Sequence, residues 1–162
     1  AAMHKHWVPV FVILTLFAAT GRADDLSLIV NGLSYHIPAD ESFNQKNIGY
    51  GLQYERVLQR HRLITGVGTY RDSYSTDAAY AQAGYSYRLL DLRPRLHLDA
   101  GAVVYAAHSA GYEDFYGRDL VVAPLPYASV GTDRLALNIT YIPRLFGAYA
   151  SVVTFQLKLT LL

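Results

Sequence analysis

Three residues whose side chains suit acyl transfer lie at the ends of two strand-like segments. His36 is near the end of the segment 26–37, and Asp72 and Ser73 are adjacent at the end of the segment 62–73. A histidine can take a proton near neutral pH, an acid can orient it, and a serine can attack or donate a hydrogen bond. These residues form a candidate catalytic set if the fold brings the two ends together, although the same residue types are common on barrel rims without any catalytic role.

The composition limits what the rest of the chain can be. The chain has 162 residues, a net charge of +1 and no cysteine. This suits a single domain and argues against a basic nucleic-acid-binding surface, a disulfide framework and a thiolate metal site. We therefore expect no nucleic-acid partner, no metal and no other cofactor.

Residues 1–23 have the pattern of a signal peptide. Residues 3–6 are basic apart from the methionine, and 8–19 form an apolar run. The segment Gly21-Arg22-Ala23 has small residues at the spacing that a signal peptidase reads. A transmembrane anchor is the alternative, but the run is shorter than the ~20 apolar residues that a spanning helix needs. We expect cleavage after residue 23 and an exported domain over 24–162.

After residue 24 apolar residues recur at every second position, which is the period of a strand with one apolar face. In the segment 47–58, for example, Ile48, Tyr50 and Leu52 alternate with small or polar residues. Turn-like segments separate eight such runs. The expected strands are 26–37, 47–58, 62–73, 78–90, 95–107, 119–131, 135–142 and 149–162.

The expected connections alternate between tight turns and longer loops, with 74–77 as a short exception. An even number of strands joined in this way is typical of an outer-membrane barrel in an exported chain. The sequence therefore predicts an all-β fold, an eight-stranded antiparallel transmembrane β-barrel of the bacterial outer membrane. A soluble barrel or sandwich is the alternative, but its exterior would be polar, whereas the repeating face here is apolar. We expect girdles of aromatic residues at Tyr35, Tyr54, Tyr70, Tyr87, Tyr141 and Tyr149.

If the chain enters the barrel from the periplasm, the His36 and Ser73 ends share the outer rim, and the site faces the outer leaflet. Alternation places small or apolar side chains inside the barrel near this rim. It places a charged floor at the other end, with Glu55, Arg88, His97, Asp99, Gln156 and Lys158. This arrangement suits an acyl-chain pocket, although ordinary packing of a narrow barrel is the alternative. The expected pocket residues are Ser86, Gly49, Gly51, Val121 and Ala123.

Prolines interrupt the sixth strand and follow the seventh. Pro124 and Pro126 lie within the sixth expected strand, and Pro143 comes directly after the seventh. Since proline cannot donate to a ladder, it is confined to edges, bulges and strand starts. We predict a lateral gate for lipid at Pro126 and Pro143. A turn-adjacent proline without a role is the alternative, and it suits Pro143 better than Pro126.

Four motifs follow one another along the chain: Ser34-Tyr35-His36, Tyr70-Arg71-Asp72-Ser73-Tyr74, Pro126-Tyr127-Ala128-Ser129-Val130-Gly131 and Thr140-Tyr141-Ile142-Pro143. In order and spacing they resemble the motifs of the outer-membrane lipid A palmitoyltransferases, the PagP-like family. The resemblance implies transfer of an acyl chain from a phospholipid to lipid A (lipopolysaccharide). It also implies catalytic roles for His36, Asp72 and Ser73, and a gate at Pro126 and Pro143.

The chain departs from that family in three places. The first strand starts soon after the expected cleavage site, which leaves no room for the family's amphipathic helix. Asn31 stands where the family has a proline, and Ser86 where it has the glycine that sets acyl length. Because of Ser86, we expect transfer of palmitate or a somewhat shorter chain. We also expect the protein to be a monomer. The alternatives are a non-enzymatic barrel that binds or shields lipid, and a lipid A deacylase or lipase.

Overall fold

The computed structural model describes residues 24–38, 42–92, 95–144 and 150–162, so the expected signal peptide lies outside the described residues. Eight antiparallel strands form a closed barrel in which β8 pairs with β1. Within the described residues no helix is long and apolar enough to cross a membrane. The elements are β1 Asp24–Ile37, β2 Lys46–Leu58, β3 His61–Arg71, β4 Asp77–Leu92, β5 Leu96–Ser109, the 3-10 helix η3 Ala110–Tyr112, α1 Glu113–Tyr116, β6 Leu120–Gly131, β7 Leu135–Ile142 and β8 Ser151–Thr160.

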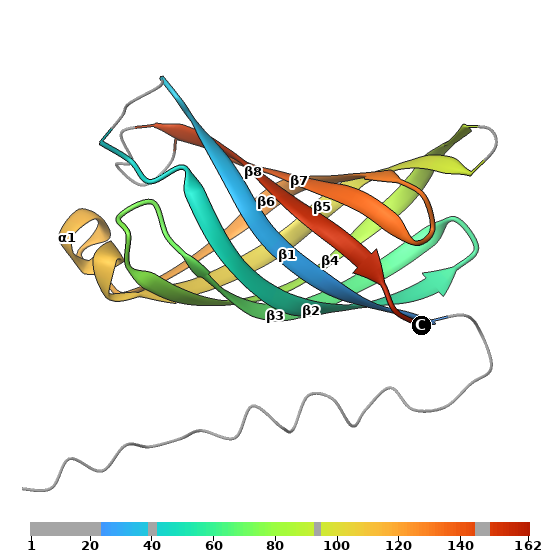
Figure 1. Ribbon diagram of the computed structural model, residues 1–162, viewed down its shortest axis with the longest axis horizontal. Coiled ribbons are helices and arrows are strands. Elements are labelled where there is room, and N and C mark those ends of the chain that lie inside the picture. Colours follow the sequence, from blue (N-terminus) through green and yellow to red (C-terminus); the bar gives the residue numbers. More distant parts are fainter. Residues whose placement is uncertain (1–23, 39–41, 93–94, 145–149) are drawn as a thin grey trace, which may run out of the picture.

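The expected strands are confirmed, with small differences at their ends. β3 stops at Arg71, two residues earlier than expected, and the first residue of the eighth expected strand, Tyr149, lies outside the described residues. The connections 59–60 and 132–134 lie at one end of the barrel, called here the turn end. The connections 72–76 and 110–119, with η3 and α1, lie at the other, called here the loop end (Figure 1).

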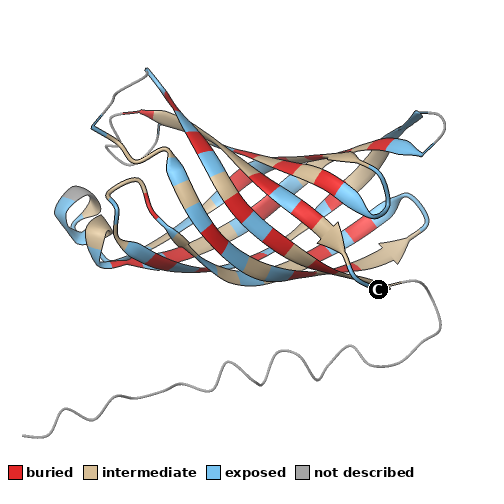
Figure 2. Cartoon of the chain, in the orientation of Figure 1, coloured by how far each residue is buried: buried red, intermediate tan, exposed pale blue. Residues whose placement is uncertain are grey.

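The outer surface of the barrel is apolar. Exposed and buried residues alternate along the strands (Figure 2), and Ile48 and Tyr50 are more than two-thirds exposed, at 68% and 69%. An outward apolar band around a polar interior is the arrangement of a transmembrane β-barrel. Among the expected girdle residues, Tyr35 and Tyr141 are exposed, whereas the prediction for Tyr70 is wrong because its side chain lines an interior cavity.

A network of buried ion pairs fills the interior toward the turn end. Glu55 lies 2.6 Å from the Lys158 amine and 2.9 Å from the Arg62 guanidinium. Asp99 lies 3.3 Å from Arg62 and 2.9 Å from Arg88. Because a buried charge without a partner is strongly destabilising, these pairs hold one another in place. The predicted charged floor is confirmed except for Gln156, which lines an interior cavity instead.

We expect Glu55→Ala to destabilise the barrel by about 3–5 kcal/mol, because Arg62 and Lys158 would keep their buried charges without the carboxylate. Denaturant unfolding of the barrel in detergent measures the change. The matched control is Arg60→Ala, which removes an exposed ion pair with Asp91 at 3.0 Å and should cost less than about 1 kcal/mol. Equal losses in the two variants would contradict a structural role for the network.

Candidate functional site

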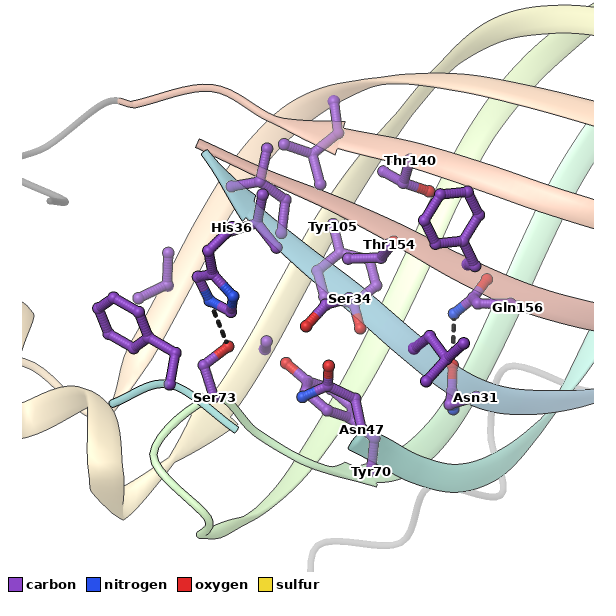
Figure 3. A pocket seen from close by; sticks show the side chains of 18 of the residues that line it. Asn31, Ser34, His36, Asn47, Tyr70, Ser73, Tyr105, Thr140, Thr154 and Gln156 are labelled. Carbon is purple, nitrogen blue, oxygen red and sulfur yellow. Dashed lines mark hydrogen bonds between the residues drawn. The ribbon is translucent and has the colours of Figure 1, made fainter. Parts of the chain in front are cut away.

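The structure brings His36 and Ser73 together at the loop end. His36 is near the end of β1, and Ser73 lies in the turn between β3 and β4. The two residues meet at a distance of 3.1 Å between His36 Nε2 and Ser73 Oγ (Figure 3). The Phe43 ring stacks on the imidazole with 4.5 Å between ring centroids. Since the two side chains lie within hydrogen-bond reach, a proton can pass between them.

His36 faces the interior because β1 contains a bulge. Ser27, Ile29 and Asn31 are buried at odd positions, whereas Ser34 and His36 are buried at even positions. The change of parity coincides with a register shift between Asn31 and Leu33, in the pairing of β1 with both β2 and β8. A bulge inserts one residue and so exchanges the two faces of a strand. The sequence carries a signal for it, since a lone glycine, Gly32, interrupts the strand pattern.

Asp72 shapes the turn that carries Ser73. Its Oδ1 accepts hydrogen bonds from the backbone N–H groups of Tyr74, at 2.9 Å, and Thr76, at 2.8 Å. Aspartate side chains commonly stabilise turns in this way, which explains why β3 ends before Asp72. Among the described residues no hydrogen bond joins Asp72 to His36. The geometry therefore places Asp72 to hold Ser73, while the catalytic role of all three residues stays a prediction.

A further residue, Ser109, ties the turn to the neighbouring loop. The buried Ser109 hydroxyl donates to Asp72 Oδ2 at 2.6 Å and accepts from the Gly111 N–H at 3.2 Å. One residue further on, the Tyr112 and Tyr70 hydroxyls lie 2.6 Å apart. Burial raises the pKa of Tyr112 well above that of an ordinary phenol, so its hydroxyl stays protonated. The loop from η3 is thus docked onto the turn that presents Ser73.

A cavity of about 160 Å³ opens beside the His36 and Ser73 pair, and its two sides differ in polarity. The apolar side comes from β6, β7, β8 and the residue before β8, with Val121, Ala123, Leu125, Ile142, Ala150 and Val152. The polar side comes from β1, β2 and β8, with Asn31, Ser34, Asn47, Thr154 and Gln156. Gln156 Nε2 donates to Asn31 Oδ1 at 2.6 Å (Figure 3). The expected apolar space is therefore apolar on one side only.

The structure corrects the residues assigned to the pocket. Two of the five line the cavity, namely Val121 and Ala123. Three do not line it, namely Gly49, Gly51 and Ser86. A Cβ atom on Gly51 would lie 2.6 Å from the Tyr80 hydroxyl, so the space beside this glycine is already filled. Gly49 lies against the backbone of β3, and Ser86 lies opposite Arg62 of the ion-pair network.

The prolines of β6 coincide with a gap in the barrel ladder. Pairing between β6 and β7 stops at Tyr127 and Thr140, whereas pairing between β6 and β5 continues to Leu120. Because the β5 side is paired throughout, the missing N–H groups of Pro124 and Pro126 point to the β7 side. Among the described residues, the segment 120–126 has no partner on β7.

The cavity lies behind this unpaired segment. Leu125 of β6 and Ile142, the last residue of β7, both line it. Pro143 follows Ile142 directly and ends the strand. The expected gate residues Pro126 and Pro143 therefore lie on the two sides of one lateral break, while passage of lipid through it stays a prediction.

Comparisons with known proteins leave the function to be argued from the geometry. No family model matches the chain, and no curated protein matches its sequence. Among solved structures it is similar to Neisserial surface protein A (NspA), with a TM-score of 0.42 and 9% identity over 85% of this chain and 96% of that chain. A likeness at this level carries no argument about activity.

We expect Asp72→Ala to speed amide hydrogen exchange at Tyr74 and Thr76, because both N–H groups lose their acceptor. Losing the partner of a buried polar group costs roughly 1–3 kcal/mol, so protection should fall about tenfold or more. Hydrogen exchange of the barrel in detergent, read by mass spectrometry, measures this. Asp77→Ala is the control, since this exposed carboxylate lies in the same region and makes only a 3.7 Å ion pair with Arg71. Unchanged protection in Asp72→Ala would refute its role in the turn.

Proposed function

We propose that this barrel is an outer-membrane acyltransferase that moves an acyl chain from a phospholipid to lipid A. The observation that carries the proposal is the His36 and Ser73 pair, 3.1 Å apart, at a cavity of about 160 Å³ in a barrel with an apolar exterior. The motif resemblance to the lipid A palmitoyltransferases supplies the identity of donor and acceptor. The enzyme acts as a monomer without a cofactor, with its site toward the outer leaflet.

His36 acts as the general base of the reaction. Its Nε2 takes the proton of the attacking hydroxyl, whose oxygen forms a bond to the ester carbon of the donor. The bond from that carbon to the glycerol oxygen breaks, and the glycerol oxygen receives the proton from the imidazolium. The products are a lysophospholipid and the transferred ester, so atoms and charge balance.

Two routes share this proton transfer. In the first, Ser73 attacks and forms an acyl-serine, which then passes the chain to a lipid A hydroxyl with His36 again as base. In the second, the lipid A hydroxyl attacks directly, and Ser73 orients the imidazole through its hydrogen bond. In both routes Asp72 is a positioning residue, because its contacts hold the turn that presents Ser73.

The lateral break provides a path for the donor. A phospholipid in the outer leaflet would insert its acyl chain between β6 and β7, where Pro126 and Pro143 leave the ladder unpaired. The chain would then meet the apolar side of the cavity first, because that side belongs to the same strands. Transfer needs no opening of the intact ladders elsewhere in the barrel.

We expect His36→Ala and Ser73→Ala each to lower transfer by about 10²–10⁴ while leaving a folded, heat-modifiable barrel, since neither residue belongs to the ion-pair network. Mass spectrometry of lipid A from cells with and without each variant is the measurement. His108→Ala is the control, because this exposed histidine at the loop end contacts Asp119 instead. If the wild-type protein adds no acyl chain to lipid A, the result favours a non-enzymatic barrel that binds or shields lipid. If the wild-type protein removes an acyl chain, the result favours a lipid A deacylase or lipase.

We expect Pro126→Ala to slow the use of bilayer phospholipid about fivefold, because a restored N–H can donate across the break, and one neutral hydrogen bond is worth ~1 kcal/mol. Transfer from a detergent-solubilised donor, which does not depend on lateral entry from a bilayer, should match wild type. Turnover rates with the two donor forms measure the difference. Unaltered rates with both donors would show that the break is not a gate.

A further inference from the structure

The polar side of the cavity contains two groups that the proposed reaction does not use. Ser34 is 5% exposed and lines the cavity, and its hydroxyl has no hydrogen-bond partner among the described residues. Asn47 donates its amide N–H to the Arg71 carbonyl at 2.7 Å, but its amide oxygen is buried and likewise without a partner there. A hydroxyl group and an acceptor therefore line the same space (Figure 3).

The position of Ser34 relates this pair of groups to the reacting atoms. Ser34 precedes His36 by two residues on β1 and shares its inward face, so it lies about 7 Å along the strand from His36, on the side away from the loops. Further from the loops, the Gln156 amide N–H donates a hydrogen bond to Asn31 Oδ1, with 2.6 Å between the nitrogen and the oxygen. The two groups without partners therefore lie beside the first few carbons of an acyl chain whose ester carbon is at Ser73.

A plain alkyl chain does not complement this side of the cavity. It would pack well against the apolar side, but it would leave the Ser34 hydroxyl and the Asn47 amide oxygen without a hydrogen-bond partner. A buried polar group without a partner costs more than an ordinary hydrogen bond is worth. A hydroxyl on the chain resolves the mismatch, since it can accept from the Ser34 hydroxyl and donate to the Asn47 oxygen.

We propose that the cavity selects an acyl chain that carries a hydroxyl group close to its carboxyl end, held by Ser34 and Asn47. This inference rests on the proposed function, because it names the acyl class taken by the same site. The hydroxyl of the chain binds and does not react, so the transfer step is unchanged. A chain without the hydroxyl binds less tightly, because it leaves Ser34 and Asn47 without hydrogen-bond partners. Sites built to bind a hydroxyl generally reject analogues that lack it in this way.

Direct binding tests the inference without requiring turnover. Calorimetry on the full barrel in detergent compares 3-hydroxypalmitate with palmitate. We expect wild type to bind the hydroxy acid about tenfold more tightly, which is within the range of one or two hydrogen bonds to buried groups. Ser34→Ala and Asn47→Ala should each reduce this preference to about threefold or less. The control is Ser86→Ala, since Ser86 is also buried without a partner for its hydroxyl but lies outside the cavity.

A transfer assay then separates this inference from the proposed function. It uses an equimolar mixture of two phospholipid donors, one with a 3-hydroxypalmitoyl chain and one with a palmitoyl chain. A binding preference that Ser34→Ala removes supports the inference, and transfer of the hydroxyacyl chain in excess supports both. A binding preference without any transfer would overturn the acyltransferase proposal alone. Equal binding of the two acids by wild type, or a preference that survives in both Ser34→Ala and Asn47→Ala, would overturn the inference even if both chains are transferred.

Discussion

The ion-pair network around Glu55 is the interaction on which the use of the barrel interior depends. Eight strands enclose a space only wide enough for side chains, so every group placed inside takes volume from a ligand. The charges of Glu55, Arg62, Asp99 and Lys158 fix one another because none can remain buried alone. They fill the interior toward the turn end, and the remaining cavity lies beside the loops. Among the described residues, the cavity beside His36 and Ser73 therefore lies toward the loop end.

At the loop end the connections, rather than the strands, give the site its geometry. The Asp72 carboxylate accepts hydrogen bonds from backbone N–H groups of the turn that contains Ser73. The Ser109 hydroxyl donates to the same carboxylate and so links this turn to the next loop. A serine on a free hairpin tip would sample many positions, whereas this one is held at 3.1 Å from His36. Such support from neighbouring residues is what a site on a connection needs to keep a reactive geometry.

Alternation predicted the strands and the charged floor because a period of two is a local property, readable within one segment. It gave the face of Ser86 correctly, since Ser86 is fully buried. Its assignment to the pocket was wrong, because Ser86 pairs with Arg62 of the ion-pair network and does not line the cavity. The role of Ser109 was equally out of reach, because its partner Asp72 is 37 residues away and only the fold joins them. Tyr70 lies six residues after the buried Ile64 on β3, so alternation places both side chains on the inner face. The sequence therefore contained the information needed to place Tyr70 inside the barrel.

The bulge at Gly32 connects the candidate catalytic pair with the polarity of the cavity. Without the extra residue, the inward face of β1 would continue from Asn31 to Leu33 and Tyr35, and His36 would face the surrounding lipid. The shift sends those two large side chains outward, where both are exposed, and turns Ser34 inward with His36. The inserted residue thus places His36 within reach of Ser73. It also replaces the apolar side chains of Leu33 and Tyr35 by Ser34 on the inner face of β1. The reacting pair and the polar side of the cavity are consequences of the same change in register.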